Sequence, residues 1–167
     1  MVISTHDRQP IVLQLPDLAA TERLAAALSA NTRCGDVIAL HGDVGAGKTA
    51  FARAFIRASG QAQGIAIDDV PSPTFTIVQL YDELEPPVWH VDLYRLEHLY
   101  ETTELGLEEG YETGITLIEW PDRLGAELPQ ARLDLRLLAG AEEDARVAEL
   151  TADEAWHSRL ELLAGWT

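Results

Sequence analysis

The alternation of apolar and polar positions predicts two strands and two helices in the first 60 residues. Residues 11–15 and 36–41 are short apolar runs bounded by turn-forming residues, as expected of buried strands. Between them, Asp17 can cap a helix over residues 18–28, where the apolar side chains share one face. Residues 48–59 show a second helical pattern with an apolar face. Strands and helices therefore alternate at the start of the chain.

The middle of the chain predicts a hairpin, an acidic segment and a further strand. Residues 74–81 are rich in β-branched and aromatic side chains, and residues 88–93 form a second such run after a turn, so the two should pair. Residues 97–112 hold six glutamates and no lysine or arginine, and we expect them to be partly helical. Residues 115–118 are apolar, which is typical of a buried strand.

The last third predicts a second hairpin and a final helix. Residues 132–138 and 146–150 should pair across a short turn, and Thr151 with Glu154 forms a capping box for the helix. Because helices and strands alternate first and hairpins follow, we expect an α/β fold. Its central sheet should be mostly parallel, with antiparallel additions.

The length of 167 residues fits a single domain, which we assign to residues 1–167. The one cysteine, Cys34, excludes an intramolecular disulfide and suits a reducing cytosol. No apolar run approaches the roughly 18 residues that a membrane helix needs, and the polar N-terminus lacks the apolar region of a signal peptide. We therefore expect a cytoplasmic protein that does not associate with membranes.

The charge balance argues against direct binding to nucleic acid. There are 28 acidic and 12 basic residues, for a net charge of -16. Such a surface repels phosphate backbones and anionic lipids. If RNA or DNA is involved, another protein should hold it. Eleven of the basic residues are arginines, and Lys48 is the only lysine.

Residues 42–49, Gly-Asp-Val-Gly-Ala-Gly-Lys-Thr, match the phosphate-binding pattern G-x-x-x-x-G-K-[ST] between a predicted strand and a predicted helix. The glycines let the backbone curl so that its N–H groups face phosphate oxygens. Lys48 should reach the β and γ phosphates, and the Thr49 hydroxyl should ligate Mg²⁺. These features predict a three-layer fold like that of P-loop NTPases. The predicted nucleotide-binding residues of this loop are Asp43, Val44, Gly45, Ala46, Gly47, Lys48 and Thr49.

A phosphate site of this kind needs a carboxylate near the metal, at the end of a neighbouring strand. Glu119 follows the apolar run 115–118 and should emerge at the carboxyl edge of the sheet, where ligands bind in open α/β folds. Asp92 competes for this role but lies on a run with a more exposed pattern. We favour Glu119 as the metal-side group. Asp92 could orient the attacking water, lie one shell away from Mg²⁺, or be an ordinary solvated acid.

Three further features could belong to the site. Strand alternation puts His90, Asp92 and Tyr94 on one face, either as a catalytic or switch cluster or as a structural network. Thr74 lies in a proline-bounded loop that could sense the γ-phosphate, or it simply precedes a strand. Trp120 could lie against the nucleotide or fill a packing gap.

The motifs together resemble the bacterial TsaE (YjeE) family. The resemblance is carried by residues 42–49, 71–75 (Pro-Ser-Pro-Thr-Phe), 90–95 (His-Val-Asp-Leu-Tyr-Arg) and 118–121 (Ile-Glu-Trp-Pro). It extends over about residues 15–128, in matching order and spacing, and no motif departs from the family pattern.

The resemblance implies a cytoplasmic ATPase in the synthesis of threonylcarbamoyladenosine in tRNA. It implies ATP and Mg²⁺ as cofactors and the proteins TsaD and TsaB as partners. It implies contact with tRNA only indirectly, through these partners. In that family ATP hydrolysis resets the TsaB–TsaD complex and TsaE does not transfer the threonylcarbamoyl group itself. The family pattern puts Mg²⁺ on Thr49 and Glu119, phosphates on Gly45 to Ala50, and function linked to hydrolysis on Asp92.

Three alternatives can be weighed from the residues themselves. A stand-alone small-molecule kinase would use the same loop but needs an acceptor pocket and usually an arginine-bearing lid, and no arginine-rich loop is present. A regulatory GTPase would need an N-K-x-D motif, which a chain with Lys48 as its only lysine cannot contain. A scaffold protein that binds a nucleotide but barely hydrolyses it would differ from an ATPase only in turnover, which the sequence does not give.

Overall fold

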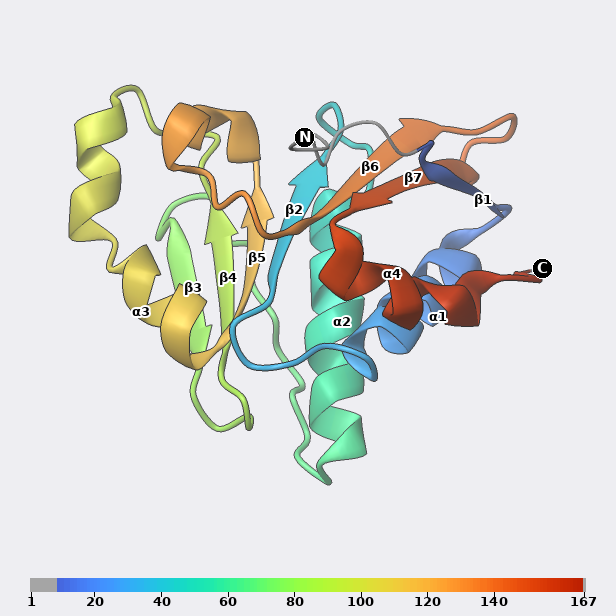
Figure 1. Ribbon diagram of the computed structural model, residues 1–167, viewed down its shortest axis with the longest axis horizontal. Helices are drawn as coiled ribbons and strands as arrows, with labels where there is room; N and C mark the ends of the chain where they lie inside the picture. The colour runs from blue at the N-terminus through green and yellow to red at the C-terminus, as the bar shows by residue number, and fades with distance from the viewer. Residues whose placement is uncertain (1–8, 167) are drawn as a thin grey trace.

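The computed structural model describes residues 9–166 (Figure 1). Within these residues, seven strands form one sheet in the order β1-β7-β6-β2-β5-β4-β3. The strands are β1 (Ile11–Leu15), β2 (Val37–His41), β3 (Val78–Tyr81), β4 (Val88–Asp92), β5 (Ile115–Glu119), β6 (Leu133–Ala139) and β7 (Arg146–Ala152). The four central strands β6, β2, β5 and β4 run parallel, whereas β3, β7 and β1 join antiparallel. The predicted α/β sheet is confirmed.

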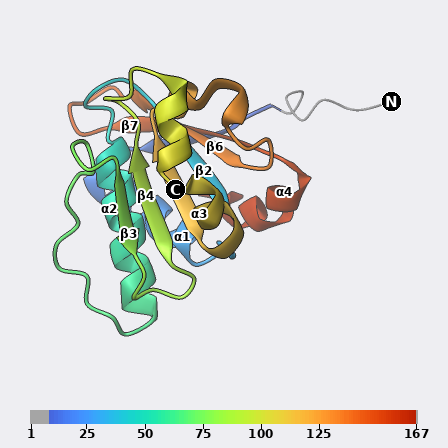
Figure 2. The same cartoon turned by 90° about the vertical axis from the view of Figure 1, so that its left-hand side faces the viewer.

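Helices cover both faces of this sheet. Helices α1 (Leu18–Ser29) and α2 (Lys48–Ala62) lie on one face, and α3 (Leu107–Thr113) lies on the other (Figure 2). The buried side chains of α4 (Glu154–Leu160) belong to the same core cluster as those of α1 and α2. Three short 3-10 segments complete the described structure: η1 (Leu99–Glu104), η2 (Pro121–Glu127) and η3 (Glu161–Leu163). None of the helices within residues 9–166 has both the length and the apolar character to cross a membrane.

The core holds the strand before the glycine-rich loop and the helix after it in fixed positions. Ile38 and Leu40 of β2 lie in the same buried cluster as Phe51 and Phe55 of α2. Both rings are fully buried, and burying each contributes about 2 kcal/mol. Val37 faces the opposite way, into a second cluster under α3. The loop between β2 and α2 is therefore held at both ends by packed elements.

The parallel register places the strand ends that matter at one edge of the sheet. Leu40 of β2 lies opposite Glu119 of β5, and Glu119 in turn lies opposite Asp92 of β4. The carboxyl ends of these strands point to the same edge, which is the upper edge in Figure 1. The sheet thus gathers a loop and two carboxylates that are far apart in sequence.

Four local expectations were wrong in detail. The strand predicted from residue 74 begins at Val78, because Ile77 takes a left-handed φ of 69° and its N–H donates to the Pro73 carbonyl at 2.6 Å. Helix α2 continues past Gly60 to Ala62. Gly60 is instead required by packing, since a Cβ there would lie 2.6 Å from the Ile65 carbonyl oxygen.

The other two differences concern a helix cap and a strand. The last helix is capped by Asp153, whose carboxylate accepts the Trp156 N–H at 3.2 Å, and Thr151 belongs to β7. Strand β4 is buried along its whole length, although its sequence reads as partly exposed. The reason is that β4 lies between β3 and β5, with helices on both faces.

Candidate nucleotide-binding site

The loop 42–49 has the backbone shape that its glycines predict. Gly45 and Gly47 have φ values of 80° and 103°, which side chains other than glycine rarely adopt. A Cβ on Gly42 would lie 2.7 Å from the carbonyl oxygen of Leu137 on the neighbouring strand β6. The loop therefore curls tightly against the sheet. This shape fits a bound phosphate group.

Lys48 lies on the inside of this loop. Its Nζ donates to the main-chain carbonyls of Gly42 and Asp43, the latter at 2.8 Å, and lies 4.2 Å from the centre of the Trp120 ring. The side chain is 5% exposed. Burial lowers the pKa of Lys48, while the carboxylates of Glu119, Asp92 and Asp43 oppose that shift. The ammonium is thus a poorly solvated cation, for which an added phosphate is a favourable partner.

Thr49 and Glu119 form the pair that the sequence predicts for a metal. The Thr49 Oγ1 donates to Glu119 Oε1 at 2.7 Å, and Glu119 Oε2 is 2.7 Å from His90 Nε2. Glu119 is 2% exposed. In octahedral Mg²⁺ coordination adjacent oxygen ligands lie about 2.9 Å apart, so these two oxygens are spaced as neighbouring ligands would be.

The pair alone is not a complete metal site. Among the described residues 9–166 there is no group of three or more His, Cys, Asp or Glu side chains that could hold a metal. Mg²⁺ keeps several waters and commonly binds through one or two protein oxygens plus phosphates. The Thr49 hydroxyl and the Glu119 carboxylate, which lie beside the glycine-rich loop, fit this mode of Mg²⁺ coordination.

Asp92 is held by hydrogen bonds to both of its oxygens. Oδ2 accepts from the Thr74 hydroxyl at 3.0 Å, and Oδ1 accepts from the Tyr94 N–H at 3.0 Å. The side chain is 4% exposed. The turn that displaces the start of β3 is what brings Thr74 to this carboxylate, because it bends the chain back before Val78. Asp92 is therefore a fixed, buried acid and not a solvated one.

A cavity of about 260 Å³ joins most of the predicted site residues. Its lining consists of Val44, Gly45, Ala46, Lys48, Thr49, Thr74, Asp92, Tyr94, Glu119 and Trp120. Three predicted residues, Asp43, Gly47 and Ala50, do not line it. Asp43 lines a larger cavity on the other side of the loop, and the Ala50 side chain lines a groove between α1 and α2.

Trp120 separates the two cavities and lines both of them. It has a left-handed φ of 57° immediately before Pro121, and its ring lies 5.0 Å from that of Tyr94. Its contact with Lys48 and its partial burial in the second core cluster show that it packs within the protein. Because Trp120 also lines both cavities, it remains a candidate for contact with a nucleotide.

The cluster at residues 90–95 is divided by the fold. His90 and Asp92 point into the site, with His90 fully buried. Tyr94 lines the cavity from just beyond the strand. The Arg95 guanidinium lies 4.7 Å from the centre of the exposed Phe75 ring and has no ion pair with an acid among residues 9–166.

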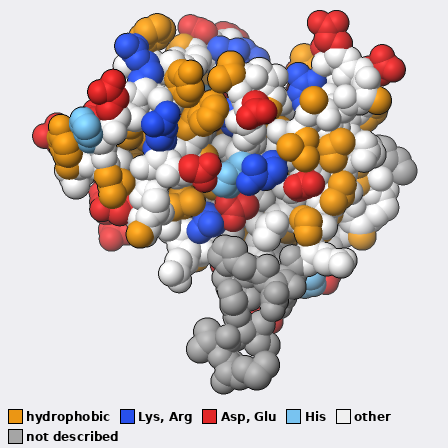
Figure 3. All heavy atoms as spheres, turned by 90° about the horizontal axis from the view of Figure 1, so that it is seen from above, with side chains coloured by type: hydrophobic (Ala, Val, Ile, Leu, Met, Phe, Trp, Pro, Cys, Tyr) orange, Lys and Arg blue, Asp and Glu red, His pale blue; other side chains and the backbone are white. Residues whose placement is uncertain are grey.

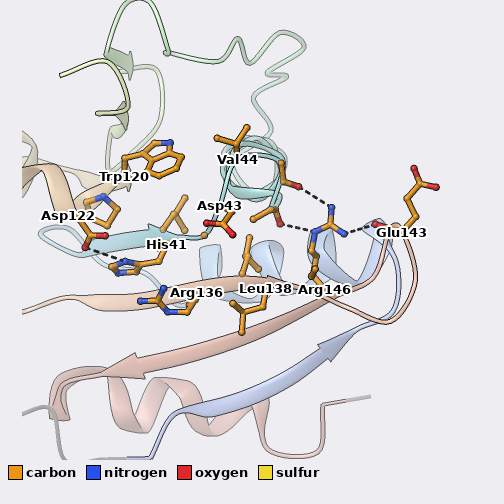
Figure 4. Close-up of a pocket in the computed structure, with 16 residues that line it drawn as sticks. His41, Asp43, Val44, Trp120, Asp122, Arg136, Leu138, Glu143 and Arg146 are labelled. Carbon is orange, nitrogen blue, oxygen red and sulfur yellow. Dashed lines mark hydrogen bonds and ion pairs between the residues drawn. The ribbon is translucent and has the colours of Figure 1, made fainter. Parts of the chain in front are cut away.

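The larger cavity, of about 570 Å³, contains two residues that the motifs do not identify (Figure 4). Arg146, at the start of β7, donates through Nε to the Ala46 carbonyl at 2.8 Å and through Nη2 to the Gly45 carbonyl at 3.2 Å. His41, the last residue of β2, lies at the other end beside Asp122. Arg146 is about a hundred residues from the loop, so no local pattern could reveal it.

The face that carries the site has side chains of both charges. Figure 3 looks down on the edge where the central strands end and shows lysine and arginine side chains grouped among carboxylates. Lys48, Arg136 and Arg146 line the two cavities. Five carboxylates line the same cavities, those of Asp43, Asp92, Glu119, Asp122 and Glu143, so the cations there lie among a larger number of acids.

Comparisons with known proteins agree with this geometry. The family model "Threonylcarbamoyl adenosine biosynthesis protein TsaE" matches residues 15–148. A relative from Bacillus subtilis, named tRNA threonylcarbamoyladenosine biosynthesis protein TsaE, is 39% identical over 134 residues, covering 79% of each chain. A relative of the same name from a Synechocystis species is 42% identical over 115 residues, covering 66% of this chain and 69% of its own.

A solved structure supports the same assignment. The crystal structure of YdiB from Bacillus subtilis superimposes with a TM-score of 0.78 at 27% identity, covering 96% of this chain and 97% of that one. This likeness confirms the expected fold of P-loop proteins. Family model, relatives and fold agree, and the chain belongs to the TsaE family.

Proposed function

We propose that this protein binds ATP with Mg²⁺ and hydrolyses it as the nucleotide-driven subunit of the tRNA threonylcarbamoyladenosine machinery. One observation carries the proposal: the Thr49–Glu119 hydrogen bond lies in the same cavity as the Asp92 carboxylate, directly beside the glycine-rich loop. A site that only held a nucleotide would not need a second buried, fixed carboxylate at this position. The relatives are named for tRNA modification and not for kinase activity.

The residues divide the work of phosphoryl transfer to water. Main-chain N–H groups of the loop and the Lys48 ammonium bind the phosphates and offset their charge. Thr49 and Glu119 would hold Mg²⁺, which supplies further charge neutralisation when bound. Asp92 cannot turn freely, because Thr74 and Tyr94 hold its two oxygens. It is therefore suited to orienting a water molecule for attack.

We propose further that the protein acts on a TsaB–TsaD pair, resetting it for another round, and does not transfer the threonylcarbamoyl group. The charge supports an indirect route to RNA, since a chain of net charge -16 needs a partner to hold tRNA. We assign residues 1–167 to one nucleotide-binding domain working in the cytoplasm.

The test is ATP hydrolysis by the purified protein, measured with and without TsaB and TsaD from the same organism. We expect slow turnover alone and a clear rise with the pair, dependent on Mg²⁺. The proposal fails if the isolated protein is equally fast. It also fails if labelled phosphate from ATP appears on a small metabolite, which would identify a kinase.

A further inference from the structure

The Glu119 carboxylate is held at both of its oxygens by side chains from two different elements. Oε1 accepts from the hydroxyl of Thr49, at the start of α2, at 2.7 Å, and Oε2 lies 2.7 Å from Nε2 of His90 on β4. His90 is fully buried and Glu119 is 2% exposed. Strands β4 and β5 are adjacent and parallel (Figure 1), so the contact joins two fixed backbones. The position of the carboxylate therefore depends on His90 as well as on Thr49.

The direction of the His90 contact follows from the chemistry of its partner. A carboxylate can only accept, so His90 Nε2 carries the hydrogen and donates it to Glu119 Oε2. The other ring nitrogen, Nδ1, is buried and has no hydrogen-bond partner within residues 9–166. Leaving such an atom unpaired costs about 1–3 kcal/mol. The bond to Glu119 is thus the one polar contact of this side chain in the described structure, and it is made at a cost in stability.

This bond restricts how Glu119 can bind a cation. Oε1 lies against Thr49 of the glycine-rich loop, whereas Oε2 is turned to a buried ring. Coordination through both oxygens needs both of them turned toward the cation, and the bonds to Thr49 and His90 hold the carboxylate against that rotation. The arrangement therefore favours coordination through Oε1 alone.

Coordination through one oxygen suits one divalent cation better than another. Mg²⁺ demands octahedral geometry, keeps several waters and binds through few protein oxygens. Ca²⁺ takes about six to eight oxygen ligands and often binds both oxygens of a carboxylate. A carboxylate that cannot turn its second oxygen to the cation thus removes a ligand that Ca²⁺ would use and Mg²⁺ would not.

We propose that His90 is a positioning residue that holds Glu119 for coordination through one oxygen and thereby makes the site prefer Mg²⁺ over Ca²⁺. The inference rests on the proposed function, since it needs a nucleotide-bound cation at Thr49 and Glu119. His90 lines neither of the two cavities beside the glycine-rich loop. It acts on the cation through Glu119 alone.

The test is isothermal titration calorimetry of the full chain with ADP and an excess of Mg²⁺ or Ca²⁺, or with EDTA. We expect the unaltered protein to bind ADP about tenfold more tightly with Mg²⁺ than with Ca²⁺. His90→Leu should weaken binding with Mg²⁺ about tenfold, the usual effect of losing a hydrogen-bond partner of a metal ligand. It should change binding with Ca²⁺ much less, so that most of the preference is lost.

Two further variants separate the hydrogen bond from the imidazole ring. In His90→Gln the amide nitrogen can take about the place of Nε2 and donate to Glu119, whereas the shorter side chain of His90→Asn reaches only about as far as Nδ1. The glutamine variant should keep the preference and the asparagine variant should lose it. Because both are polar, this comparison holds even where His90→Leu does not fold.

The matched control is Thr116→Val on β5. It removes a fully buried hydroxyl that has no hydrogen-bond partner within residues 9–166, and it should leave the preference for Mg²⁺ unchanged. The inference is overturned if the unaltered protein binds ADP equally well with both cations. It is also overturned if His90→Leu keeps the full preference, or if His90→Gln loses as much of it as His90→Asn. If ADP does not bind under any of these conditions, the proposed function itself fails, and this inference fails with it.

Discussion

The two cavities beside the glycine-rich loop are built on different principles. In the smaller one, Glu119 and Asp92 are 2% and 4% exposed, and both are held by hydrogen bonds before any ligand is present. In the larger one, Asp122 is 90% exposed and His41 Nδ1 lacks a partner. The first arrangement is preorganised for charge and the second is left for a ligand to complete. The phosphate side should therefore control the chemistry and most of the affinity, and the larger cavity should contribute a smaller share of the affinity.

The largest effect expected is on the phosphate side. Lys48→Ala should weaken ATP binding by about 100-fold or more, because it removes a charge-assisted contact from a site with little solvent. Calorimetry with ATP and Mg²⁺ measures this directly. Arg57→Ala is the matched control, since it removes an exposed cation from the same helix and should leave affinity unchanged. Equal affinity in the Lys48 variant would contradict the phosphate assignment.

Asp92→Ala should separate chemistry from binding. We expect nucleotide affinity within a few-fold of the unaltered protein and turnover with the partner proteins about 100-fold lower, the usual cost of losing a group that positions or deprotonates a nucleophile. Binding and steady-state hydrolysis are measured on the same preparation. Asp82→Ala, in the exposed turn after β3, serves as the control. A loss of binding would instead make Asp92 structural or a metal ligand.

The phosphate side was predictable from sequence because its parts follow local rules. A glycine-rich turn between a strand and a helix can be recognised without knowing the rest of the fold. Glu119 could be brought to Thr49 from sequence because parallel strands end at a common edge, which needs only the order of elements. The hydrogen bond from Thr74 to Asp92 was not predictable, because Ile77 gives no local signal for its left-handed turn.

The wall of the larger cavity could not be predicted in the same way. His41 precedes the loop and is named by no motif, and its partner Asp134 is set by the β2–β6 pairing. Arg146 reaches the loop only because β7 pairs with β6. These contacts come from long-range strand register, which a single sequence constrains weakly. The fold class can be predicted without knowing this register, whereas the residues that line the larger cavity cannot.

Arg146→Gln tests whether the loop depends on the second hairpin. The Arg146 guanidinium donates hydrogen bonds to the Gly45 and Ala46 carbonyls, and the shorter glutamine side chain cannot make both of them. Without these bonds the loop should become less well ordered. We expect about tenfold weaker ADP binding, measured by calorimetry. Arg23→Gln, an exposed position on α1, should have no effect, and an unchanged ADP affinity in the Arg146 variant would contradict the dependence of the loop on the second hairpin.

The smallest effect expected is on stability and shows how far the larger cavity is ordered without ligand. The pKa of Asp134 is lowered in the fold, so its carboxylate stabilises the protein at pH values above its unfolded pKa of about 3.8. That contribution is lost as pH falls through the lower, folded pKa. Asp134→Asn should therefore reduce the free energy of unfolding by about 1 kcal/mol at pH 7 and by less at pH 3. Urea denaturation at both pH values measures the difference, with exposed Asp144→Asn as the control. If the difference in unfolding free energy between Asp134→Asn and the unaltered protein is the same at both pH values, the His41–Asp134 contact is not formed in the ligand-free protein. The two cavities would then differ in how well they are ordered as well as in how exposed their side chains are.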